Sequence, residues 1–154
     1  MKQIKILSLF LIIIISGCSQ INKASDFITN PTAKEQYKRD FNVSDELFQI
    51  WENLAETAFQ DSIEISLPYA ETGKFYPKNF PVYSYEIKLQ PGEVFNLVVE
   101  TDSTKQLVFV ELFERTADTI PKFEKVESTS FQKKNLIFEA EKTATYKVVI
   151  QPQN

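Results

Sequence analysis

Residues 83–90 read YSYEIKLQ, a run in which apolar and polar side chains alternate. A Pro91-Gly92 pair follows, and residues 93–100 then read EVFNLVVE. Successive side chains of a β-strand point to opposite faces, so the apolar residues of the first run share one face and its charged residues the other. Pro-Gly is a turn signal between two β-rich runs, and the sequence therefore predicts an antiparallel hairpin here.

Further β-rich runs extend this pattern in both directions along the chain. One precedes the hairpin, and four follow it; they span residues 63–67, 107–114, 121–127, 135–140 and 144–151. Seven short strands with no helical pattern between them predict an antiparallel two-sheet β-sandwich over residues 61–154. The run 107–114 is apolar on both faces up to Glu111, which favours an interior position in a sheet.

Residues 30–60 carry helical signals instead. Asn30-Pro31 predicts the start of a short helix that reaches Arg39, and Ser44 predicts the start of an amphipathic helix over 44–60. The apolar residues of this second helix recur at spacings of three and four, so they form one stripe. The stripe either packs against the sandwich or binds a partner protein. The candidate partner-binding residues are Leu47, Ile50, Trp51 and Leu54.

The first 17 residues have the pattern of a secretion signal. Lys2 and Lys5 precede the run Ile6–Ile15, which is apolar except for Ser8. Such a run has the length of a signal-peptide core and is about half as long as a membrane-spanning helix. It leads into Ser16-Gly17-Cys18, which resembles the bacterial lipobox. That resemblance implies cleavage before Cys18 and acylation of this cysteine.

The predicted organisation follows from this N-terminus. Residues 1–17 are a signal peptide, 18–29 an acylated cysteine with its tether, 30–60 a helical segment and 61–154 the sandwich. Cys18 is the only cysteine, so no disulfide can form. The segment after it lacks the acidic cluster typical of surface-export signals, which favours an outer-membrane lipoprotein facing the periplasm.

Composition excludes several classes of function. Cleavage would leave 15 basic and 21 acidic residues, a net charge of −6, which disfavours nucleic acid as a partner. The chain has no histidine, and its three glycines are widely separated. This excludes the usual zinc sites, histidine-dependent nucleophiles and glycine-rich phosphate loops. We therefore expect no enzyme activity, no metal and no cofactor.

The segment between residues 69 and 81 is rich in aromatic residues although its prolines predict a loop. Aromatic faces stack on sugar rings, so one interpretation is a glycan-binding loop. The alternative is a loop that closes the end of the hydrophobic core. The candidate binding residues are Tyr69, Phe75, Tyr76 and Phe80.

Three tripeptides resemble the acceptor sequence of protein O-glycosylation in Bacteroidetes, an Asp followed by Ser or Thr and a small or apolar residue. Their acceptor residues are Ser62, Ser103 and Thr119. Each lies at a predicted turn or at the end of an element, where Asp-Ser is also ordinary turn chemistry.

Two further resemblances concern the folded part. Residues 85–93 (YEIKLQPGE) and 143–150 (TATYKVVI) resemble the two signatures of prepeptidase-type jelly-roll domains, although that family usually has glycine at the position of Ala144. The order of lipobox, charged helix, residues 61–69 (DSIEISLPY), residues 71–73 (ETG) and sandwich is similar to the N-terminal region of Bacteroidetes lipoproteins that carry a lysostaphin-type zinc endopeptidase domain.

These resemblances imply a non-catalytic module of the cell envelope with a jelly-roll-like sandwich. It would bind peptidoglycan or another glycan, or dock an envelope hydrolase. One alternative is a truncated or stand-alone N-terminal part of a peptidase lipoprotein that lacks the catalytic domain. Another is a structural or inhibitory lipoprotein that binds its partner through the helix 44–60. The zinc-binding motifs of the peptidase have no counterpart in this chain.

Overall fold

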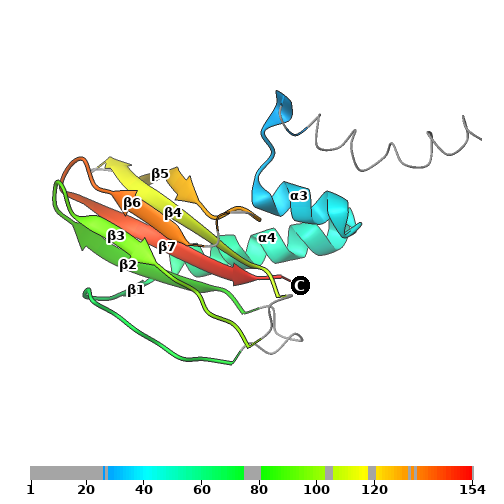
Figure 1. Cartoon of the computed structure of the whole chain (residues 1–154), viewed down its shortest axis with the longest axis horizontal. Helices are drawn as coiled ribbons and strands as arrows, with labels where there is room; N and C mark the ends of the chain where they lie inside the picture. The colour runs from blue at the N-terminus through cyan, green and yellow to red at the C-terminus, as the bar shows by residue number, and fades with distance from the viewer. Residues whose placement is uncertain are drawn as a thin grey trace, which may run out of the picture. The chain divides into compact units, whose positions relative to one another are not determined.

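The computed structural model describes residues 26, 28–74, 81–102, 106–117, 121–131, 133 and 135–153. The chain divides into two compact units, Met1–Thr32 and Ala33–Asn154. The second unit contains two helices followed by seven strands (Figure 1). The prediction of a mainly β chain with helices near its N-terminus is therefore confirmed.

The helices are α3 (Ala33–Asp40) and α4 (Asp45–Gln60). The strands are β1 (Ile63–Glu64), β2 (Tyr83–Leu89), β3 (Val94–Leu97), β4 (Val108–Ala117), β5 (Lys122–Ser128), β6 (Leu136–Glu139) and β7 (Ala144–Pro152). All seven strands begin and end within three residues of the predicted runs, because alternation marks an extended segment whichever strand it pairs with.

The predicted hairpin between the first two long runs is wrong. The strands form a five-stranded sheet in the order β1-β2-β7-β4-β5 and a two-stranded sheet of β3 and β6. β2 therefore pairs with β7, and β3 pairs with β6. A hairpin of β2 and β3 would leave its apolar face uncovered, whereas separating them lets the two apolar faces pack against each other.

The turn between β2 and β3 carries the chain from one sheet to the other. Gly92 has a φ of 80°, a conformation that suits glycine. Its N–H donates to the carbonyl of Ala140 at 2.7 Å, and the N–H of Ala140 donates to the carbonyl of Glu93 at 2.9 Å. These bonds anchor the turn at the end of β6.

The larger sheet is mixed rather than wholly antiparallel. β1 runs parallel to β2, and the N–H of Ile65 adds one more bond, to the carbonyl of Glu86 at 3.0 Å. Of the predicted strand 63–67, only Ile63 and Glu64 pair with β2, so the strand is shorter than expected. β4 lies between β7 and β5, which confirms its predicted interior position.

The main core lies between the two sheets. Leu112 and Tyr146 are fully buried there, and Ile87 and Leu89 of β2 face Phe95 of β3 in the same cluster. The hydroxyl of Tyr146 donates to Glu114 at 3.3 Å, which satisfies the one polar atom of this ring.

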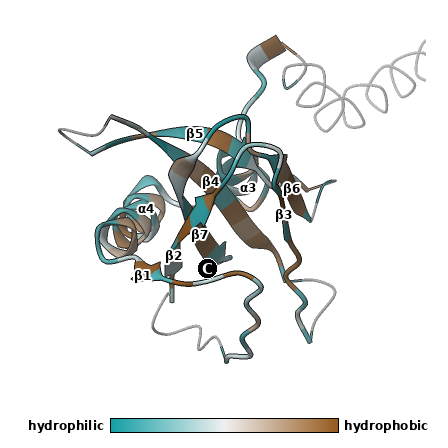
Figure 2. Cartoon of the chain, turned by 90° about the vertical axis from the view of Figure 1, so that its left-hand side faces the viewer, coloured by the Kyte–Doolittle hydropathy of each residue, from teal (hydrophilic) through white to brown (hydrophobic). Residues whose placement is uncertain are grey.

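The helices cover the opposite face of the five-stranded sheet. Tyr37 of α3, Trp51 of α4 and Phe109 of β4 form a second buried cluster, in which the Trp51 and Phe109 rings meet edge to face at 5.3 Å. The indole N–H of Trp51 donates to the carbonyl of Pro152, and the buried amide of Gln151 donates to the carbonyl of Trp51. Figure 2 shows α4 on one side of the sheet and β3 with β6 on the other.

The two predicted helix starts have different outcomes. Ser44 caps α4 as expected, since its side chain accepts from the N–H of Leu47 at 3.3 Å. The predicted start at Asn30 is wrong, because α3 begins at Ala33. Asn30 has a φ of 45°, and its N–H donates to the carbonyl of Asp26, so it ends a helical turn of the first unit.

Candidate functional site

Four residues form a cluster at β2, which we call the tyrosine cluster. Tyr69 and Glu71 come from the aromatic-rich segment after β1, and Tyr83 and Tyr85 come from β2. The rings of Tyr69 and Tyr85 lie 5.7 Å apart, and those of Tyr83 and Tyr85 are stacked at 6.4 Å. Glu71 accepts hydrogen bonds from Tyr69 at 2.5 Å and from Tyr85 at 2.8 Å. One carboxylate thus fixes two aromatic rings relative to each other.

Alternation along β2 explains how the strand contributes to this cluster. Tyr83 and Tyr85 are two residues apart, so their side chains lie on the same face of the strand. Tyr85 is 7% exposed and is part of the protein interior. Tyr69 is 48% exposed, so its ring presents a surface to solvent.

The electrostatics of the cluster keep both hydroxyl groups protonated. Burial, followed by the bond to Glu71, raises the pKa of Tyr85 far above its ordinary value. The bond to Glu71 is the main cause of the raised pKa of Tyr69. Both bonds go to the same oxygen, Oε2, and none to Oε1 occurs within the part of the chain that the structure describes.

An exposed ring beside a carboxylate oxygen suits a sugar. The apolar face of a pyranose stacks on an aromatic ring, and its hydroxyl groups need hydrogen-bond acceptors. Of the four predicted loop residues, Tyr69 belongs to this cluster. Phe75, Tyr76 and Phe80 lie outside the described residues.

The sequence interpretation did not include Glu71 or Tyr85 in the site. Glu71 lies only two residues after Tyr69, but spacing in a loop does not indicate which carboxylate will meet a tyrosine. Tyr85 comes from a strand and reaches Glu71 only because residues 65–74 return alongside β2.

The four candidate partner-binding residues of α4 differ in their exposure to solvent. Trp51 is 2% exposed and belongs to the core cluster, and Leu54 is half-buried. Leu47 and Ile50 are 37% and 45% exposed. A partner could therefore contact Leu47 and Ile50 directly, whereas Trp51 fixes the helix to the sheet.

A group of ion pairs also ties the helices to the sheet. Lys34 of α3 lies 2.8 Å from Glu111 of β4 and 3.1 Å from Glu52 of α4, and Lys125 of β5 lies 3.0 Å from Glu111. Burial pushes the pKa of Glu111 upward, but Lys34 and Lys125 outweigh it and hold the pKa below its ordinary value. These contacts give the group a structural role.

The remaining predicted sites are only partly described. The hydroxyl of Ser62 donates to the carbonyl of Phe59 at 2.8 Å and lies 2.7 Å from the hydroxyl of Ser84, so a glycan there would have to displace these bonds. Cys18, Ser103 and Thr119 lie outside the described residues.

Among the residues that the structure describes, no three metal-ligating side chains come together, and no helix is long and apolar enough to span a membrane. Comparison with protein-family models, with curated proteins and with solved structures found no match to this chain.

Proposed function

We propose that this protein is a lipid-anchored, non-catalytic module of the cell envelope that binds the glycan of peptidoglycan. The observation that carries the proposal is the exposed ring of Tyr69, held in place by Glu71 and Tyr85. A ring that is already ordered loses little conformational entropy on binding, which favours stacking on a sugar.

The location rests on the N-terminal sequence. The apolar run and Ser16-Gly17-Cys18 support export and acylation at Cys18, followed by a position in the outer membrane facing the periplasm. We further infer that the two sheets form a jelly-roll-like sandwich. The core cluster that joins their facing sides supports this assignment.

A binding role agrees with the chemistry of the cluster. The chain has no histidine, and the carboxylate of Glu71 already accepts from two tyrosine hydroxyls. Hydrolysis of a glycosidic bond would require a pair of carboxyl groups placed on either side of the bond. We infer neither a catalytic residue nor a cofactor.

The test is co-sedimentation of the full-length protein, purified in mild detergent, with isolated peptidoglycan sacculi. We expect wild type to pellet, and Tyr69→Ala to bind about fivefold more weakly, since one aromatic contact is worth roughly 1 kcal/mol. Phe41→Ala is the matched control, because Phe41 is an exposed ring, 58% accessible, on the α3 side of the protein. Thermal unfolding checks that both variants remain folded.

Two results would contradict the proposal. The first is wild-type protein that stays in the supernatant. The second is an equal loss of binding in both variants, which would indicate unspecific association through aromatic residues.

A second candidate function is docking of a protein partner, such as an envelope hydrolase, through α4. The exposure of Leu47 and Ile50 supports it. Ile50→Asp should then release a hydrolase that wild-type protein retains from a cell extract, with no change in binding to sacculi. The third candidate is that this chain is the N-terminal part of a longer peptidase lipoprotein. The module would then place the peptidase domain on its substrate.

A further inference from the structure

Ile63 is an exposed apolar side chain at the edge of the five-stranded sheet. It is 61% exposed, and its strand, β1, stands at the end of the order β1-β2-β7-β4-β5. A single exposed isoleucine is ordinary on a protein surface. This one differs because it lies beside the tyrosine cluster.

The strand register places Ile63 next to Tyr85. The two residues are partners in the parallel pairing of β1 with β2. Paired residues of neighbouring strands point to the same face of a sheet, and Ile65, two positions further on, packs against the main core. The ring of Tyr69 lies 5.7 Å from the ring of Tyr85. Ile63 and Tyr69 are therefore exposed neighbours of the same buried ring.

The backbone around Ile63 is fixed on both sides. Before it, the hydroxyl of Ser62 donates to the carbonyl of Phe59 at 2.8 Å, in the last turn of α4. After it, the N–H of Ile65 donates to the carbonyl of Glu86 at 3.0 Å. A side chain on a fixed backbone loses less conformational entropy when a ligand covers it, which favours binding.

Ile63 and Tyr69 offer two kinds of apolar surface. The face of an aromatic ring suits the C–H face of a pyranose, whereas a branched aliphatic side chain suits a methyl group. A sugar that carries an acetamido group has both features. The one charged residue of the tyrosine cluster is Glu71, and its carboxylate disfavours an anionic ligand. A neutral N-acetylated sugar is therefore the better match.

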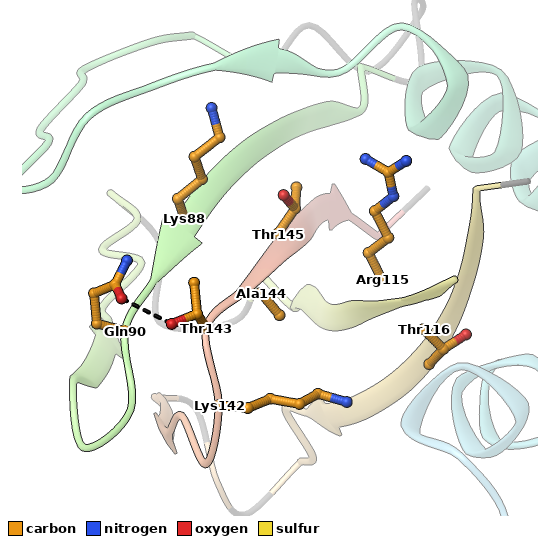
Figure 3. Close-up of a pocket in the computed structure, with 8 residues that line it drawn as sticks. All are labelled: Lys88, Gln90, Arg115, Thr116, Lys142, Thr143, Ala144 and Thr145. Carbon is orange, nitrogen blue, oxygen red and sulfur yellow. Dashed lines mark hydrogen bonds between the residues drawn. The ribbon is translucent and has the colours of Figure 1, made fainter. Parts of the chain in front are cut away.

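A hollow of about 380 Å³ beside Lys88 and Thr145 offers no such combination (Figure 3). Among the eight described residues that line it, none is aromatic and one, Ala144, is apolar. The pyranose face would find no ring to stack on there. The chemistry of an N-acetylated sugar thus favours the surface of Ile63 and Tyr69.

We propose that Ile63 contacts the methyl group of an acetamido substituent while the pyranose ring that bears this substituent stacks on Tyr69. The inference rests on the proposed function, because it names the sugar class for the same site: N-acetylated sugars, which form the glycan strands of peptidoglycan. Ile63 sets the preference for the acetylated sugar, and Tyr69 contributes affinity for a sugar of either kind.

The test is NMR titration of the full-length protein, purified in mild detergent, with chitotetraose and with cellotetraose. These two neutral tetrasaccharides share their β-linkage and differ in the acetamido group. We expect wild type to bind chitotetraose about fourfold more tightly, which corresponds to the burial of about one methyl group.

The variants separate the two contacts. Ile63→Ala should weaken chitotetraose binding about fourfold and so remove the preference. Ile63→Thr, which keeps the β-branched shape that favours a strand, should reduce the preference as well. Tyr69→Ala should weaken the binding of both tetrasaccharides about fivefold. Ile137→Ala is the matched control, since Ile137 is 52% exposed and lies on β6 of the other sheet.

Thermal unfolding checks that each variant remains folded. Equal binding of both tetrasaccharides by wild type, or an unchanged preference in the Ile63 variants, overturns the inference; the proposed function then stands if Tyr69→Ala still weakens binding. A control that loses the preference as much as Ile63→Ala also overturns the inference. If neither tetrasaccharide gives saturable shifts up to roughly 50 mM, glycan binding at the tyrosine cluster fails and the inference fails with it.

Discussion

Glu111 shows at the level of one residue how this chain tolerates a charge in its interior. Its carboxylate is 14% exposed and lies between Lys34 and Lys125, which come from α3 and β5. A buried carboxylate without partners would be protonated, but two ammonium groups stabilise the charged form. The group thus joins three elements through one side chain.

This arrangement makes stability depend on pH in a defined direction. Because the folded-state pKa of Glu111 lies below its ordinary value of 4.5, its contribution is complete above that pH. It is lost as the pH falls through the lower folded-state value. We expect Glu111→Gln to lower the free energy of unfolding by about 3 kcal/mol at neutral pH, because it leaves Lys34 without its closest partner.

The measurement is urea denaturation of wild type and Glu111→Gln at pH 7 and at about pH 3.5, where the difference between them should shrink. Comparing the two proteins at each pH cancels the titration of other groups. Glu124→Gln serves as the control, since its pair with Lys122 is exposed and should contribute under about 1 kcal/mol. A difference that grows on acidification would contradict this account.

The helix α4 contains neighbouring residues with opposite surroundings. Trp51 is 2% exposed, contacts Phe109 and donates to Pro152, whereas Ile50 is 45% exposed. We expect Trp51→Ala to lower the free energy of unfolding by about 4 kcal/mol, as for other buried aromatic residues. Ile50→Ala should change it by less than about 1 kcal/mol.

Chemical denaturation of both variants checks this prediction. A loss of stability in Ile50→Ala as large as that in Trp51→Ala would show that the exposed edge of α4 is covered in solution. That outcome would contradict our description of Ile50 as exposed, and it would favour α4 as a docking surface.

Much of the element order could be predicted from the sequence, because alternation and capping are local. The strands β2, β4 and β7 lie where alternation predicts them, and Ser44 caps α4 as its residue type indicates. The pairing of strands is not local. Each of β2 and β3 has one apolar face, and nothing in their sequences distinguishes a shared sheet from two sheets packed face to face.

The candidate site, like the fold, could be predicted from the sequence only in part. Tyr69 stands out as an aromatic residue in a loop, and it belongs to the tyrosine cluster. Its partner Tyr85 looks like an ordinary core residue of a strand. The role of Tyr85 depends on the loop residue Glu71, which lies within hydrogen-bond distance of its hydroxyl.

At the scale of the whole second unit, the elements form three layers. The helices cover one face of the five-stranded sheet, and β3 with β6 cover the other (Figure 2). The tyrosine cluster lies on the face of β2 that also carries Ile87 and Leu89.

The most direct test of this account is NMR titration of the full-length protein with a soluble peptidoglycan disaccharide fragment. We predict saturable shifts of the backbone signals of Tyr69, Glu71 and Tyr85, and their loss in Tyr69→Ala while the variant stays folded. No shift at these residues, or shifts confined to α4, would contradict the assignment of the tyrosine cluster as the glycan-binding site.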